Sequence, residues 1–130
     1  MTFNIGVIGL GVGSKHLDAY AKNPLCRVKL ICDFDEQKIN EHKESFPNIE
    51  STRDPQRILT DPEIQIVSIA SYDQYHASEI VEAFKNRKHV FIEKPLCRTR
   101  YEFNEVKKAH QLDPDLVVST NFILRREPRF

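Results

Sequence analysis

The chain has 130 residues, enough for one domain of ordinary size whose hydrophobic core needs neither a metal ion nor disulfide bonds. Its 19 Lys and Arg residues balance its 19 Asp and Glu residues, so no net charge draws it to nucleic acid or to an acidic membrane. The apolar runs are too short to span a bilayer, and the N-terminus lacks the basic stretch of a secretory signal. We therefore expect a cytoplasmic protein whose partner is a small molecule.

The three cysteines, Cys26, Cys32 and Cys97, are widely spaced and form no CxxC pair. This pattern favours reduced, buried thiols over a disulfide framework or a zinc site. We expect no bound metal.

Short apolar runs alternate with amphipathic segments along the chain. The runs predict strands over residues 3–8, 28–32, 49–51, 64–70, 89–92 and 116–120. Helical periodicity predicts helices over residues 12–22, 35–46, 74–85 and 99–111, and Asp-Pro pairs at 54–55 and 61–62 predict two further helical turns. Strands rich in Val and Ile that alternate with helices indicate an α/β fold, a doubly wound parallel sheet of the Rossmann type.

The run Gly9-Leu10-Gly11-Val12-Gly13-Ser14 directly follows the first predicted strand and opens the first predicted helix. At such a place free N–H groups and the helix dipole favour a pyrophosphate. Gly9 suits a tight turn, and Gly11 allows phosphates to approach the backbone. The third glycine of GxGxxG falls at Ser14, so either Ser14 packs closely there or Gly13 does so in a loop one residue shorter.

Asp33 follows the second predicted strand, 24 residues after Gly9, where a carboxylate binds the ribose hydroxyls of an adenosine. No Arg follows it to bind the extra phosphate of NADP. We therefore predict NAD as the cofactor. Asp35 is expected to be the N-cap of the next helix.

Two further polar segments follow the fourth and fifth predicted strands. Ser71, Asp73 and His76 come after the fourth strand, and Glu93 and Lys94 close the fifth. In a sheet of order 3-2-1-4-5-6, both strand ends line the ligand crevice. Taken alone, a His there is more often structural than catalytic, and a Lys before a Pro is usually a solvated loop residue.

Together these motifs resemble the glucose–fructose oxidoreductase and inositol dehydrogenase family, often written Gfo/Idh/MocA, over essentially the whole chain. The similar segments are IGVIGLGVGSKH, LICDFDEQKI, LTDPEIQIVSIAS with the later YH, and HVFIEKPL. The strand that ends in Glu-Lys-Pro is the most specific of them.

The resemblance implies an NAD-dependent dehydrogenase of a sugar, sugar derivative or cyclitol, with Lys94 near nicotinamide and substrate as the catalytic residue of this chain. It also implies a cis Lys94-Pro95 bond. The contacts to the cofactor are then expected from Gly9, Gly11, Val12, Gly13, Ser14, Asp33, Ser71, Asp73, His76, Glu93 and Lys94.

Family members are considerably longer, and a second domain supplies their catalytic base, most of the substrate pocket and most of their oligomer contacts. We therefore expect a cofactor domain over residues 1–120 and the passage to a second domain over 121–130, with no activity from this chain alone. One departure is Ser71-Tyr72-Asp73 in place of the usual Thr-Pro-Asn, which affects a contact to the nicotinamide-side ribose.

Two alternatives stay open from the sequence. The chain could be a non-catalytic NAD(H)-binding module. Alternatively, because the glycine loop also reads as GxGxG, it could be an S-adenosylmethionine-dependent methyltransferase.

Overall fold

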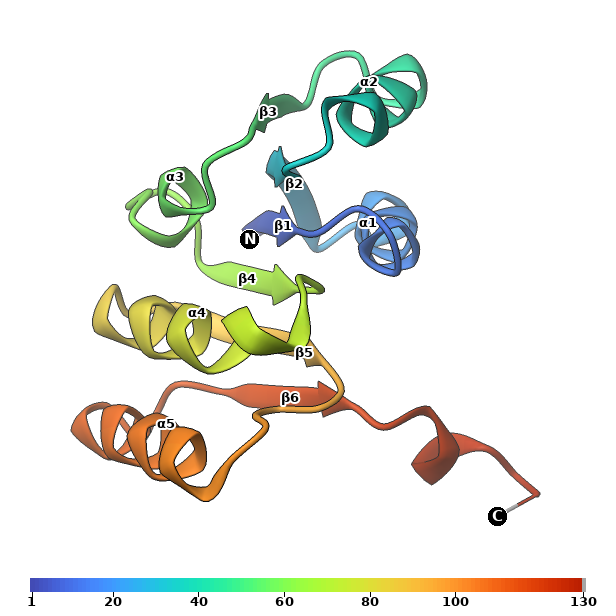
Figure 1. Ribbon diagram of the computed structural model, residues 1–130. Helices are drawn as coiled ribbons and strands as arrows, with labels where there is room; N and C mark the ends of the chain where they lie inside the picture. Colours follow the sequence, from blue (N-terminus) through green and yellow to red (C-terminus); the bar gives the residue numbers. More distant parts are fainter. Residues whose placement is uncertain (130) are drawn as a thin grey trace.

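The six apolar segments pair into one parallel sheet with the order β3-β2-β1-β4-β5-β6 (Figure 1). The computed structural model describes residues 1–129. Its strands are β1 (Phe3–Ile8), β2 (Cys26–Cys32), β3 (Glu50–Thr52), β4 (Ile66–Ile69), β5 (His89–Glu93) and β6 (Val118–Asn121). The predicted fold class is confirmed.

Every strand after β1 is reached through a helix, as parallel pairing requires. The helices are α1 (Gly13–Lys22), α2 (Glu36–Ser45), α3 (Gln56–Leu59), α4 (Asp73–Lys85) and α5 (Arg100–Leu112), and a 3-10 turn, η1 (Ile123–Arg126), follows β6. Two helix starts are fixed by side-chain caps: Asp35 accepts a hydrogen bond from the Gln37 N–H, and Thr99 accepts one from Glu102. The predicted cap at Asp35 is confirmed.

One sequence expectation about local structure is wrong. The Asp61-Pro62 pair forms only a turn, because the chain enters β4 a few residues later and Asp61 accepts the Glu63 N–H within that turn. Beyond Asn121 the backbone turns into η1, which leads away from the sheet (Figure 1).

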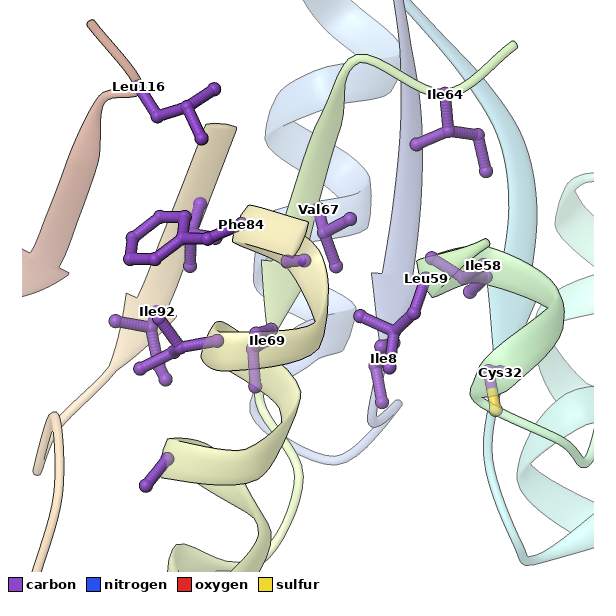
Figure 2. Close-up of a cluster of buried hydrophobic side chains, with 14 of the residues drawn as sticks. Ile8, Cys32, Ile58, Leu59, Ile64, Val67, Ile69, Phe84, Ile92 and Leu116 are labelled. Atoms are coloured by element: carbon purple, nitrogen blue, oxygen red, sulfur yellow. The ribbon is translucent and has the colours of Figure 1, made fainter. Parts of the chain in front are cut away.

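Two hydrophobic clusters lie on the two faces of the sheet. Strand residues that alternate along β2 and β4 face opposite ways, so one face packs against α3, α4 and α5 and the other against α1 and α2 (Figure 1). Figure 2 shows the larger cluster, in which the ring of Phe84 of α4 lies near Ile92 of β5 and Leu116, and Leu59 of α3 lies near Ile8 of β1. Burying these side chains is the main source of stability in such a domain.

Charged side chains close the amino edge of the sheet. Lys88 is 2% exposed, and its ammonium donates to the backbone oxygens of Asp61 (2.5 Å) and Ile64 (2.9 Å). Lys29 donates to the carboxylates of Asp61 (2.6 Å) and Glu63 (2.5 Å). These contacts hold the turn before β4 against β2 and β5.

The opposite, carboxyl edge is the one that matters for function. The strand order reverses between β1 and β4, so the loops after these two strands diverge and leave a crevice. None of the helices in residues 1–129 has the length and apolar character to cross a membrane.

Candidate functional site

A cleft of about 350 Å³ opens at this reversal of strand order. The loops after β1, β2 and β4 form its walls. Its lining residues are Ile8, Gly9, Gly11, Val12, Cys32, Asp33, Phe34, Asp35, Lys38, Ala70, Ser71, Tyr72 and Asp73. Six of the predicted site residues are therefore brought together here: Gly9, Gly11, Val12, Asp33, Ser71 and Asp73.

Gly9 makes the turn that ends β1. Its φ is +89°, and a Cβ there would lie 2.3 Å from the Ala70 carbonyl oxygen and 2.9 Å from the Ser71 nitrogen. Only glycine fits this backbone conformation and this contact. The loop after β1 therefore lies directly against the loop after β4.

Gly11 and Gly13 have different roles. A Cβ at Gly11 would meet nothing closer than the Lys38 ammonium at 3.8 Å, so the backbone there is open to a ligand. A Cβ at Gly13 would lie 3.2 Å from the Ala70 side chain, so Gly13 allows α1 to pack closely on the sheet. Of the two alternatives, the structure supports Gly13 over Ser14, whose hydroxyl instead donates to the Gly11 carbonyl oxygen within the loop.

Asp33 joins the glycine loop to the start of α2. Its Oδ2 accepts the Leu10 N–H at 2.8 Å, and its Oδ1 accepts the Asp35 N–H at 2.8 Å. Each carboxylate oxygen has a second lone pair, so Asp33 still has acceptor capacity toward the cleft. This is the arrangement that can bind two ribose hydroxyls.

Three lining side chains with the chemistry to contact a ligand, Phe34, Lys38 and Tyr72, were not among the predicted site residues. Phe34 and Tyr72 face the cleft from opposite loops and are 49% and 67% exposed, and Tyr75 packs edge-on against Phe34 with ring centroids 6.0 Å apart. Lys38 is the one cation among the described lining residues, and it makes no ion pair within residues 1–129. Two signals were available in the sequence. Phe34 directly follows Asp33, and Lys38 lies in the first turn of the next predicted helix.

Ser71 lies on the cleft wall and is held from behind by Glu79 of α4. The Ser71 hydroxyl donates to Glu79 Oε2 at 2.5 Å. Burial raises the pKa of Glu79 to about 7, and the Ser71 hydrogen bond and the neighbouring His76 offset only part of that shift. Burial, with nearby carboxylates, raises the pKa of Cys32 to about 12, so this lining thiol is not a nucleophile at neutral pH.

His76 lies behind the cleft wall, not on it. Its side chain is 1% exposed, and its two ring nitrogens lie 2.6 Å from the Pro95 oxygen and 2.9 Å from the Ser71 oxygen. The ring joins the loop after β4 to the segment after β5. This position favours support of the two loops over direct contact with a cofactor.

Glu93 ends β5 inside a polar cluster on the α1 face of the sheet. Its Oε1 accepts hydrogen bonds from His16 (2.8 Å) and Asn121 (2.7 Å), and His16 also bonds Ser68 (2.7 Å). Burial raises the pKa of Glu93, but these hydrogen bonds outweigh it and hold that pKa below its usual value. The anionic Glu93 thereby joins α1 and β6 to the end of β5, next to Lys94.

That residue, Lys94, is exposed and starts a cis peptide bond to Pro95, as predicted. Ile69 and Ile92 are register partners in β4 and β5, so Lys94 emerges at the same edge as Ser71. It lies outside the cleft lining, as do Gly13, Ser14, His76 and Glu93.

The cleft suits a dinucleotide by its chemistry. The N-terminus of α1 has no acidic residue in its first turn and, with Lys38, supplies positive charge for a pyrophosphate. Asp33 offers acceptors for a ribose, and Phe34 and Tyr72 offer flat apolar surface for a base. Within residues 1–129, no His, Cys, Asp and Glu side chains gather in a group that could hold a metal ion.

Comparison with known proteins agrees with this chemistry. Residues 3–121 match the model of the Gfo/Idh/MocA oxidoreductase family, NAD-binding Rossmann fold. The chain is 30% identical to myo-inositol 2-dehydrogenase of Thermotoga maritima, over 97% of this chain and 38% of that protein. It is 34% identical to levoglucosan dehydrogenase of Pseudarthrobacter phenanthrenivorans, over 96% of this chain and 34% of that protein.

Solved structures show the same likeness. A levoglucosan dehydrogenase in complex with NADH and levoglucosan superposes with a TM-score of 0.81 at 32% identity, over 91% of this chain and 34% of that one. The scyllo-inositol dehydrogenase of Lactobacillus casei with NAD(H) and scyllo-inositol has a TM-score of 0.89 at 24% identity, over 96% of this chain and 37% of that one, which shows the shared fold.

The chain thus spans between a third and two fifths of the length of these curated relatives. The matches are to nicotinamide-dependent enzymes, which leaves the methyltransferase alternative without support. The cleft at the β1–β4 reversal and the family match lead to one conclusion: the chain belongs to the Gfo/Idh/MocA oxidoreductase family and is its NAD(H)-binding Rossmann domain.

Proposed function

We propose that this domain holds NAD(H) for the reversible oxidation of a hydroxyl group on a sugar, sugar derivative or cyclitol. The observation that carries the proposal is the cleft, in which an open glycine loop and the Asp33 carboxylate come together, with Lys94 emerging at the same edge of the sheet. The inositol and levoglucosan dehydrogenases among the relatives support this class of substrate.

The adenosine half of the cofactor is assigned to the Asp33 side of the cleft. The Asp33 carboxylate would accept hydrogen bonds from the ribose hydroxyls, and its negative charge would repel the extra phosphate of NADP. Phe34, backed by Tyr75, and Tyr72 on the facing loop provide surfaces against which adenine can stack. The open backbone at Gly11 and the nearby Lys38 ammonium would then hold the pyrophosphate.

The nicotinamide half is assigned to the side of Asp73, beyond Ser71 and toward the end of β5. A nicotinamide ring held there would supply the acceptor for the hydride that leaves the substrate carbon. Lys94 holds the substrate hydroxyl oxygen and stabilises the negative charge that develops on it. The cluster of His16, Glu93 and Asn121 positions Lys94 by fixing the end of β5.

Because the relatives are much longer, we propose that the base that takes the hydroxyl proton, and most of the substrate site, come from residues outside this chain. Residues 1–130 alone should then bind NADH but show no turnover. The measurement is NADH formation over a panel of sugars, sugar acids and cyclitols. A rate that rises in proportion to protein concentration with any of them contradicts this division of labour.

The cofactor assignment is tested by titrating NADH and NADPH calorimetrically. NADH should bind more tightly. Asp33→Asn should weaken NADH binding by ~1–2 kcal/mol, the scale of hydrogen bonds to a charged group, while weakening NADPH less. Asp115→Asn, a substitution of an exposed Asp before β6 at the opposite edge, is the matched control and should change neither. Equal or tighter binding of NADPH by the unaltered chain would overturn the assignment.

The role of Lys94 is tested in a protein in which this domain has its substrate site. Lys94→Met should leave NADH affinity nearly unchanged and lower turnover ~10²-fold or more, the scale of losing one donor to a developing oxyanion. Lys107→Met, on the exposed face of α5, controls for the change of net charge. Near-normal turnover of the Lys94→Met protein assigns Lys94 to the fold alone.

A further inference from the structure

Glu79 is a buried carboxyl group directly behind the wall of the cofactor cleft. It lies in the middle of α4 and is 6% exposed, while the hydroxyl that donates to it, that of Ser71, lines the cleft. Ser71 also lies against Gly9 of the glycine loop, because its nitrogen would be 2.9 Å from a Cβ at residue 9. A change at Glu79 therefore reaches the phosphate-binding end of the cleft through a single hydrogen bond.

The titratable groups around Glu79 offer it little positive charge. On its own helix the neighbour is His76, whose ring nitrogens face the backbone carbonyl oxygens of Ser71 and Pro95. From β2 the neighbour is the Cys32 thiol, on which the carboxylates of Asp33 and Asp54 act as well. No Lys or Arg forms an ion pair with Glu79 in the described chain. Burial without such a partner favours the neutral acid.

The protonation of Glu79 decides what Ser71 can offer to a ligand. A hydroxyl has one proton. When Glu79 is a carboxylate, Ser71 donates that proton to it and presents only lone pairs to the cleft. When Glu79 is protonated, the acid can donate to the Ser71 oxygen, and the Ser71 proton is free to reach a ligand oxygen.

A dinucleotide distinguishes these two states. Its pyrophosphate carries negative charge, and its phosphate oxygens accept hydrogen bonds but do not donate them. The protonated state gives it a donor and removes a nearby negative charge, so both effects act in the same direction. Since coupling is reciprocal, a bound pyrophosphate must also favour the uptake of a proton by Glu79.

We propose that Glu79 is a positioning residue that links proton uptake to cofactor binding, so that NADH binds most tightly when Glu79 is protonated and Ser71 donates into the cleft. The inference rests on the proposed NAD(H) site and adds to it a dependence on pH. The linked group lies in the cofactor domain, so the effect needs no substrate.

The test is calorimetric titration of the chain with NADH, in buffers of different ionisation enthalpy, which counts the protons taken up on binding. Near pH 7.5 a fraction of a proton should be taken up, and affinity should fall about threefold to tenfold between pH 6.5 and 8.5. Glu79→Gln should bind NADH with little dependence on pH and without proton uptake, at an affinity like that of the unaltered chain at pH 6.5, because the amide also donates to Ser71.

Two further variants separate this role from simple support of the fold. Ser71→Ala should bind more weakly than Glu79→Gln at every pH and take up no proton. Glu82→Gln, on the same helix but bonded to Asn86, should keep the proton uptake of the unaltered chain. Each variant is checked for native circular dichroism before titration.

The outcomes are distinguishable. NADH binding without proton uptake, or a Glu79→Gln variant with the unaltered pH profile, overturns the role of Glu79 while leaving the cofactor assignment intact. A folded chain that binds no NADH at any pH overturns both.

Discussion

The amino edge of the sheet and the cleft at its carboxyl edge differ in how fully their charged groups are paired. At the amino edge, Lys88 and Lys29 each meet two oxygens, and although burial raises the pKa of Asp61, the hydrogen bond from Lys29 helps to bring it below its usual value. At the carboxyl edge, Lys38 has no ion-pair partner in the described chain, and burial holds the pKa of Glu79 near 7. Satisfied charges stabilise a fold, whereas charges with unused capacity are available to a ligand.

The largest expected effect is on stability and belongs to the amino edge. Lys88→Met should lower the free energy of unfolding by about 2–4 kcal/mol, because it leaves two carbonyl oxygens buried without their donor. Urea unfolding followed by circular dichroism measures it, and NADH affinity of the folded variant should be unchanged. Lys107→Met, at an exposed position, is the control. A loss below about 0.5 kcal/mol, the range of ordinary surface changes, would erase the contrast between the edges.

The next effect belongs to the carboxyl edge and has the opposite sign. The pKa of Glu79 in the folded chain, about 7, lies above its usual 4.5, so the stability that the protonated group provides is present below pH 4.5 and lost as pH rises to about 7. The free energy of unfolding of Glu79→Gln should therefore exceed that of the unaltered chain by about 1–3 kcal/mol at pH 8, and the two should be nearly equal at pH 4.5. Parallel urea titrations at the two pH values measure this. A variant that is less stable at pH 8 shows that Glu79 is satisfied as an anion.

The smallest effect concerns the aromatic side of the cleft. Phe34→Ala should weaken NADH binding by about 1 kcal/mol, the value of one aromatic stacking contact, and leave stability nearly unchanged because the ring is half exposed. The chain has four Tyr and no Trp, so quenching of tyrosine fluorescence by ADP-ribose reports directly on the adenosine half. Tyr101→Ala, in the exposed part of α5, is the control. If Phe34→Ala binds ADP-ribose with unchanged affinity, adenine does not stack against Phe34.

The sequence determined those features that depend on residues close together in the chain. Apolar runs of strand length and amphipathic helices predicted the α/β sheet. The observed ends of most strands and helices differ from the predicted ends by one or two residues. At β4 the shift is at the start of the strand, where the turn around Asp61 extends further than the apolar run suggested. Glycines after a strand and an Asp after the next strand predicted the cleft, because both sit where their strands end.

Only the tertiary structure decided which side chains meet across long stretches of sequence. Gly13, not Ser14, lies against Ala70, and His16 reaches Ser68 and Glu93 over sequence separations of 52 and 77 residues. Likewise Glu79 reaches Ser71 only because α4 turns it inward beneath the loop after β4. Local spacing predicts where a strand or a loop lies, but the environment of a charge is set by the packing of segments that the chain order leaves apart, and that packing exists only in the folded domain.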